Sequence, residues 1–179
     1  YQDVPSPVAA MPKEFADGHH IAPHHHRRAQ VVHAIAGTMR LSTPSGAWVV
    51  PPRRAVWVPG GTEHEIRMVG PVSMRTLYIE PGAAPFMPAA HCAVIEISPL
   101  LRELILAMGE QPIDARPDRR ERVKTLRTRV LAVFVLQFTR RDVVHAREAE
   151  DVLVRLLQRH IRGALADHDT EFAFVVDAA

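Results

Sequence analysis

Short apolar runs separated by turn residues extend from residue 18 to residue 98, and this pattern constrains the fold more than any other feature. The segments TPSG (43–46) and PGG (59–61) are strong turn signals, because proline and glycine favour backbone angles that regular strands avoid. Short strands at a spacing of about eight to twelve residues are typical of an all-β sandwich or barrel. The expected strands span residues 29–37, 38–43, 46–50, 54–58, 63–69, 72–80 and 91–98. Residues 1–17 contain three prolines and are expected to form an irregular arm.

The pattern changes from short runs to helical spacing at Ser98. Ser98 suits the N-cap of a helix, Pro99 suits its first position, and Gly109 suits its end. Residues 111–118, which contain two prolines, are interpreted as a linker, and residues 119–138 and 143–166 as further helices. The first helix carries an apolar stripe of Leu100, Leu101, Leu104, Ile105 and Met108.

Composition excludes several classes of protein. Hydrophobic residues make up 47% of the chain, too many for a disordered protein. No run of eighteen apolar residues occurs, so we expect no membrane-spanning helix and a cytoplasmic protein. The single cysteine, Cys92, excludes an internal disulfide framework and is interpreted as a small buried apolar residue.

Histidines supply the main candidate for chemistry. Eleven are present, and five of them lie between residues 19 and 26. His24, His26 and Gln30 share one parity, so a single extended strand would direct all three to the same side. His64 follows the turn at residues 59–61, and a barrel could bring it to the same point. Three imidazoles with an open position suit Zn²⁺, Ni²⁺, Fe²⁺ or Mn²⁺. The other eight histidines are interpreted as bystanders on surfaces or helix faces.

This spacing resembles the cupin family. The first cupin motif, Gly-x5-His-x-His-x3,4-Glu-x6-Gly, matches residues 18–37, with Gln30 where the family has glutamate. The core of the second motif, Pro-x-Gly-x2-His, matches residues 59–64, whereas Arg53 and Met68 stand where that motif has its end residues. The resemblance implies a double-stranded β-helix, or jelly-roll, barrel followed by C-terminal α-helices. It also implies a metal held by His24, His26 and His64, with Gln30 as fourth ligand or effector contact.

A closer resemblance covers residues 24–103, including the strings HHHRRAQVVHAIAGTMRL, GAWVVPPRRAVWVPGGTEHEIRM and HCAVIEISPLLRELILAM. They are similar to the N-terminal sensing domain of AraC-type transcriptional regulators. The resemblance implies a small-molecule effector, an effector-sensing cupin domain over residues 1–97 and a homodimer formed through a helix at residues 98–110. Residues 111–179 are left as a helical tail of uncertain role. The DNA-binding helix-turn-helix part of such regulators is expected to be absent from this chain.

The basic part of the tail offers only a weak sign of nucleic-acid binding. Residues 116–147 contain ten Lys or Arg and three Asp or Glu. Their one candidate turn, at residues 139–142, lacks the glycine common in a helix-turn-helix. A helical hairpin with a solvated arginine face is therefore favoured over a DNA reader.

Two functional alternatives remain open beside the sensor hypothesis. One is a metal-dependent enzyme of the dioxygenase or isomerase class, although no catalytic acid or base is evident near the histidines. The other is a metal-free cupin whose histidines form a pH-responsive pocket. The apolar wall of the effector pocket is expected to comprise Met39, Leu41, Trp57, Ile66 and Met68.

Overall fold

Seven antiparallel strands make up most of the structure, a computed structural model that describes residues 1–4, 6–111 and 117–139. The strands are β1 (Val8–Phe15), β2 (His20–His24), β3 (Ala29–Thr43), β4 (Gly46–Val50), β5 (Arg54–Val58), β6 (His64–Ile79) and β7 (Ala93–Glu96). A 3₁₀ turn, η1 (Pro81–Ala83), and two helices, α1 (Pro99–Gly109) and α2 (Pro117–Thr139), complete the described part. The predicted class, mainly β with helices after the strands, is confirmed.

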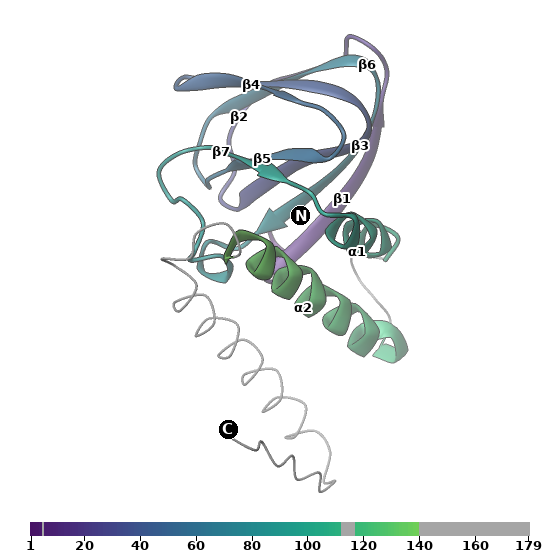
Figure 1. Cartoon of the computed structure of the whole chain (residues 1–179). Coiled ribbons are helices and arrows are strands. Elements are labelled where there is room, and N and C mark those ends of the chain that lie inside the picture. The colour runs from purple at the N-terminus through teal and green to yellow at the C-terminus, as the bar shows by residue number, and fades with distance from the viewer. Residues whose placement is uncertain (5, 112–116, 140–179) are drawn as a thin grey trace, which may run out of the picture. The chain divides into compact units, whose positions relative to one another are not determined.

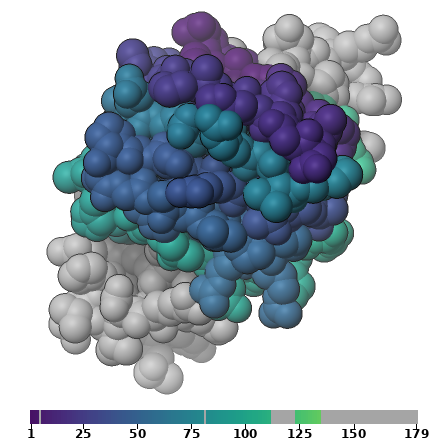
Figure 2. Space-filling model, turned by 90° about the horizontal axis from the view of Figure 1, so that it is seen from above, coloured from purple at the N-terminus to yellow at the C-terminus, as the bar shows by residue number. Residues whose placement is uncertain are grey.

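The two longest strands organise the sheet. Its order is β1-β6-β3-β5-β7, with β2 on β6 and β4 on β3. β3 and β6 pair with each other along most of their length and curl around a common interior (Figure 1). Seen from above, side chains of the purple, blue and teal segments lie close together over this face (Figure 2). β3 and β6 each merge two predicted strands, because bulges and glycines bend the chain there without ending the pairing.

Two apolar clusters lie on opposite sides of the curled sheet. The first fills the interior and includes Phe15, Val32, Met39, Leu41 and Ile66. The second lies between the outer face of the sheet and the two helices. Successive residues of β3 pack alternately into one cluster and the other, as expected for a strand buried on both faces.

Helix α1 begins as predicted from its capping residues. The Ser98 hydroxyl accepts a hydrogen bond from the Leu101 backbone N–H at 3.2 Å. The apolar stripe is divided, because Leu101, Ile105 and Met108 are buried against this chain's own sheet and Leu104 packs partly against it. Leu100, in contrast, is 59% exposed.

Helix α2 covers the same outer face of the sheet as α1. Val130, Leu131 and Phe134 belong to the outer apolar cluster. The ring of Phe134 lies 6.3 Å from that of Trp57 and 6.0 Å from that of Phe86. The predicted helix at 119–138 is therefore confirmed, whereas the one predicted at 143–166 lies outside the described residues. No helix within the described residues is long and apolar enough to cross a membrane.

The prediction of an irregular N-terminal arm is wrong for residues 8–15. They form β1, which pairs with β6 from Val8 opposite Ile79 to Phe15 opposite Val72. Pro12 is tolerated because β1 lies at the edge of the sheet, where one side of the strand needs no ladder hydrogen bond. β2 was also not predicted, since its sequence HIAPH contains a proline and only two hydrophobic residues, Ile21 and Ala22.

Gly37 should tolerate no side chain, because it lies at the bulge of β3 with φ of +78°. A Cβ atom at this position would lie 2.2 Å from the Pro71 carbonyl oxygen and 2.8 Å from a Val72 methyl group. We expect Gly37→Ala to lower the free energy of unfolding by about 2 kcal/mol or more, as measured by urea denaturation. Gly82→Ala is the control, since a Cβ at Gly82 would meet nothing within 4 Å. Equal stability of the two variants would contradict the prediction.

Candidate metal centre

Three histidine side chains converge inside one end of the barrel. His24 ends β2, His26 lies in the bend that follows, and His64 begins β6 opposite His24. One ring nitrogen of each histidine lies within 4.8 Å of those of the other two. The structure therefore brings together the three histidines singled out in the sequence.

The reason for this convergence differs from the predicted one. We expected one extended strand to direct His24, His26 and Gln30 to the same side, but the chain bends between β2 and β3. The turn at residues 59–61 packs on this bend, and the Gly61 N–H donates to the His26 carbonyl at 2.8 Å. A Cβ on Gly60 would lie 2.2 Å from the Arg27 carbonyl oxygen, so the close approach requires glycine there.

Each histidine is oriented by a hydrogen bond from its Nδ1 atom to a backbone carbonyl. A carbonyl oxygen only accepts, so this contact places the proton on Nδ1 and leaves a lone pair on Nε2. Outer contacts of this kind fix the ring orientation of histidines that bind metals. The pairs are His24 with Ala22 at 2.9 Å, His26 with Arg28 at 2.8 Å and His64 with Thr62 at 2.9 Å.

The Gln30 amide is oriented by a chain of hydrogen bonds. The Thr76 hydroxyl donates to the Val31 carbonyl at 2.8 Å, so it can only accept from Gln30. Gln30 Nε2 donates to this hydroxyl at 3.1 Å. Gln30 Oε1 consequently faces the Nε2 atoms of His26 and His64, at 3.1 and 3.0 Å.

In this arrangement hydrogen-bond acceptors face other acceptors without a proton between them. Gln30 Oε1 meets two imidazole nitrogens that carry lone pairs, and the opposite tautomers would instead set nitrogen lone pairs against the backbone carbonyls. Protonation would relieve the conflict, but burial lowers the pKa of His26 and lowers that of His64 to about 4. A cation relieves it directly. The donor set of three imidazoles and one amide oxygen thus fits a divalent transition metal.

Comparison with known proteins shows the family of the chain. The family model described as the AraC-like ligand binding domain matches residues 14–131. The chain belongs to this family.

One curated relative of this AraC-like domain is the HTH-type transcriptional regulator NimR of Escherichia coli. The two are 38% identical over 95 residues, which is 53% of this chain and 34% of NimR. The chain thus spans about a third of the length of that regulator.

Solved structures similar to the AraC-like domain include several cupin proteins. A cupin superfamily protein from Desulfitobacterium hafniense matches with a TM-score of 0.37 and 17% identity, over 41% of this chain and 77% of that one. The cupin domain of Schizosaccharomyces pombe Cnp3 matches with a TM-score of 0.40 and 16% identity, over 45% and 60%. A Bacillus subtilis oxalate decarboxylase variant matches with a TM-score of 0.39 and 16% identity, over 44% and 22%.

Tyr78 is the main residue near the histidines that sequence reasoning missed. Its ring lies edge-on to His26 at 5.1 Å, and it stacks on Tyr1 at 5.8 Å. Its hydroxyl donates to Met11 Sδ at 3.9 Å and lies 3.5 Å from Gln30 Nε2. Burial raises the pKa of Tyr78 to about 12, so it remains a neutral phenol. No local motif marks Tyr78, because its position follows from the pairing of β6 with β3, where it lies opposite Gln30.

Four of the five residues predicted to line the effector pocket lie together in the structure. Met39, Leu41, Ile66 and Met68 lie together in the interior cluster. Trp57 is corrected to the outer cluster, where its Nε1–H donates to the Pro88 carbonyl at 2.8 Å. The physical reason is strand alternation, since Val56 and Val58 take the inward positions of β5.

The two carboxylates that flank His64 in sequence turn away from the centre. Glu65 binds His20 at 2.7 Å, and Glu63 is exposed. Neither is placed as an acid or base for the metal centre.

His33 is corrected from a surface bystander to a buried residue. Only 1% of it is exposed, its Nδ1 contacts the Arg54 carbonyl at 3.0 Å, and its Nε2 has no partner among the described residues. Burial lowers the pKa of His33, and the nearby charge of Arg102 adds to this effect. The folded state therefore holds His33 neutral.

Acid should destabilise the domain partly through His33. Because its folded pKa lies below the unfolded value of about 6.5, the unfolded state binds more protons as pH falls, and stability decreases below about pH 6.5. Each unit of pKa depression corresponds to about 1.4 kcal/mol. Urea denaturation with a chelator at pH 7.5 and pH 5 should show a smaller acid-induced loss in His33→Gln than in the wild type. His91→Gln, at an exposed position, should retain the wild-type loss. An unchanged loss in His33→Gln would contradict the prediction.

Proposed function

We propose that this chain is the effector-sensing domain of an AraC-family transcriptional regulator and acts in the cytoplasm. A divalent transition metal held by His24, His26 and His64, with Gln30 as fourth ligand, lies at its sensing site. Family membership and the identity with NimR support the regulator assignment. The observation that carries the metal assignment is the convergence of imidazole Nε2 atoms on Gln30 Oε1.

A metal held by these residues would supply a Lewis-acidic site for a donor atom of the effector. The chain's own residues orient the ligands, since backbone carbonyls hold the three imidazoles and Thr76 holds the Gln30 amide. Tyr78 and Tyr1 provide an aromatic surface beside His26. We propose an effector that combines a metal-binding donor atom with an apolar or aromatic body.

Dimerisation through α1 is part of the same proposal. Most of the apolar stripe is buried within the chain, so the surface left for a partner centres on exposed Leu100 with half-buried Leu104 beside it. Leu100→Glu is expected to shift a dimer toward monomer in light scattering at micromolar concentration. A homodimer that persists in this variant would overturn the assignment of α1 as the interface.

DNA contact in a whole regulator is proposed to involve a helix-turn-helix part beyond the matched residues, because NimR is named as an HTH-type regulator. For the present chain we expect weak, salt-sensitive binding to DNA. Tight and sequence-specific binding by the 179-residue chain would contradict this assignment.

A thermal-shift screen tests the sensing function. The protein, loaded with Zn²⁺ or Ni²⁺, is screened against small molecules beside chelated protein and a His24→Ala variant. A sensor should show compounds that raise Tm only in the loaded wild type and remain chemically unchanged in mass spectra after incubation. A compound that is consumed would favour a metal-dependent enzyme instead. Binding that is equal with and without metal would remove the metal from the proposal.

A further inference from the structure

The candidate metal centre contains no negatively charged group. The Nδ1 proton leaves each of the three imidazole rings neutral as a ligand, and Gln30 offers the oxygen of a neutral amide. Within residues 1–4, 6–111 and 117–139, no carboxylate or thiolate joins the three histidines in a group that could hold a metal. A divalent cation bound by these four side chains would therefore keep its whole charge.

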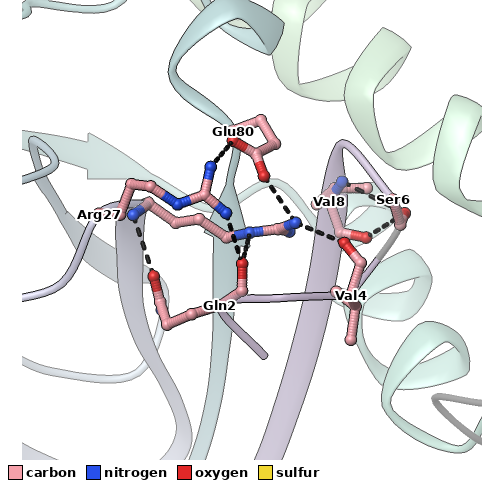
Figure 3. Close-up of polar contacts among 7 residues, drawn as sticks. Gln2, Val4, Ser6, Val8, Arg27 and Glu80 are labelled. Carbon is pink, nitrogen blue, oxygen red and sulfur yellow. Dashed lines mark hydrogen bonds and ion pairs between the residues drawn. The ribbon is translucent and has the colours of Figure 1, made fainter.

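Two carboxylates beside the ligand residues are bound elsewhere. Glu65, the residue after His64, lies 2.7 Å from a ring nitrogen of His20. Glu80 contacts the two residues that follow His26 in the chain. Its Oε1 atom lies 2.7 Å from Arg28 Nη2, and its Oε2 atom lies 3.1 Å from Arg27 Nη1 (Figure 3). Neither carboxylate can reach the centre without leaving these contacts.

Arg28 is itself fixed in place, so Glu80 has little freedom to move. Only 1% of Arg28 is exposed. Its Nε atom donates to the Gln2 carbonyl at 3.0 Å, and its Nη2 atom donates to the Val4 carbonyl at 2.7 Å (Figure 3). The backbone carbonyl of Arg28 also accepts the hydrogen bond that orients His26. The residue that positions one metal ligand therefore also holds the Glu80 carboxylate in an ion pair.

An uncompensated charge is costly here because the centre is largely buried. Gln30 is 2% exposed and His64 is 1% exposed. Beyond His64, the inward residues Ile66 and Met68 of β6 belong to the interior apolar cluster. A cation that loses its hydration and gains no counter-charge is unfavourable in such surroundings. A negatively charged donor atom lowers this cost, whereas a neutral donor leaves the charge in place.

On the basis of the metal centre proposed above, we infer that the effector is an anion, an organic carboxylate whose charge offsets that of the metal. The neutral amide of Gln30 makes the two binding events interdependent, since each raises the affinity for the other. The aromatic surface of Tyr1 and Tyr78 beside His26 favours a carboxylate carried on an apolar or aromatic body.

The affinity of the full chain for Zn²⁺, measured with and without carboxylates, tests this inference. Competition with a coloured chelator is run in sodium formate, acetate or benzoate, and in the neutral amides formamide, acetamide or benzamide. The pH is fixed, and sodium perchlorate keeps the ionic strength constant. We expect a saturating carboxylate to raise the zinc affinity about tenfold or more and the matching amide to leave it unchanged. Formate extends the test to a centre that admits only a small acid.

Two variants with the same change of charge locate the effect. Gln30→Glu supplies the negative charge from the protein, so the gain in zinc affinity from added carboxylate should be largely lost. Gln111→Glu, just after the end of α1, should keep the wild-type gain. An equal gain in Gln30→Glu and the wild type would overturn the role assigned to Gln30.

The reciprocal measurement is independent of the chelator. Isothermal titration of the most effective carboxylate into zinc-loaded and zinc-free protein should give affinities that differ by the same factor. If zinc binds, loses affinity in folded His64→Ala and gains none from any carboxylate, the anionic effector is overturned and the metal centre stands. If zinc binds equally to folded His64→Ala and the wild type, the metal centre of the proposed function is overturned as well.

Discussion

Replacing His64 with alanine should lower the affinity for Zn²⁺ and Ni²⁺ by about 100-fold or more. His64 is 1% exposed and directs its Nε2 atom at Gln30, so its loss removes one of three nitrogen ligands. Substitutions that only disturb the partners of metal ligands already cost about 10–100-fold in affinity. Competition with a coloured chelator measures the affinity, and elemental analysis of untagged protein measures the metal content.

Two further variants sharpen this prediction. His91→Ala, at an exposed position, should retain the wild-type affinity. Gln30→Glu should shift preference toward Mn²⁺ and Fe²⁺, because it supplies the carboxylate that harder cations favour. It should also cost about 1 kcal/mol of stability in the metal-free state, since the hydrogen bond to Thr76 is lost. Equal metal affinity in folded His64→Ala and the wild type would rule out the centre.

Replacing Phe134 with alanine should lower the free energy of unfolding by about 3–5 kcal/mol. The side chain is fully buried and packs near the rings of Trp57 and Phe86. Its removal leaves a cavity between α2 and the outer face of the sheet. Urea denaturation followed by the fluorescence of Trp48 and Trp57 measures the effect.

Val69→Ala is the matched control for this second prediction. Val69 is 59% exposed on β6, and its truncation should change stability by about 0.5 kcal/mol or less. If Phe134→Ala leaves the unfolding of the barrel unchanged, α2 is not part of the same cooperative unit. Residues up to Phe138 are expected to unfold together, because they form one compact unit.

Elements with strong local signals could be predicted from the sequence. β4 follows the turn segment at residues 43–46, β5 precedes the one at residues 59–61, and α1 has a serine N-cap with proline at its first position. In each case the determining residues lie within a few positions of the element. The two family motifs are equally local, and together they indicate the three histidines.

Elements that depend on distant partners could not be predicted. β1 contains a proline and polar residues, and it forms because β6 offers a complete antiparallel partner. The bend between β2 and β3 was missed for the same reason, since the turn at residues 59–61 packs on it from elsewhere in the chain. The assumption of one extended strand therefore nominated residues that do converge, although it is the bend between β2 and β3 that brings them together.

Residue type and spacing are enough to indicate a β-barrel with following helices and to nominate His24, His26, His64 and Gln30 as one group. Only the tertiary structure decides which atoms of this group face one another. The amide of Gln30 is turned by Thr76, which is distant in sequence and lies on β6. Trp57 faces outward near Phe134 of α2, and His33 is buried within range of the Arg102 charge on α1, for a similar reason. The sides of a strand are equivalent until the rest of the chain packs against them, so contacts between distant segments determine orientation and burial.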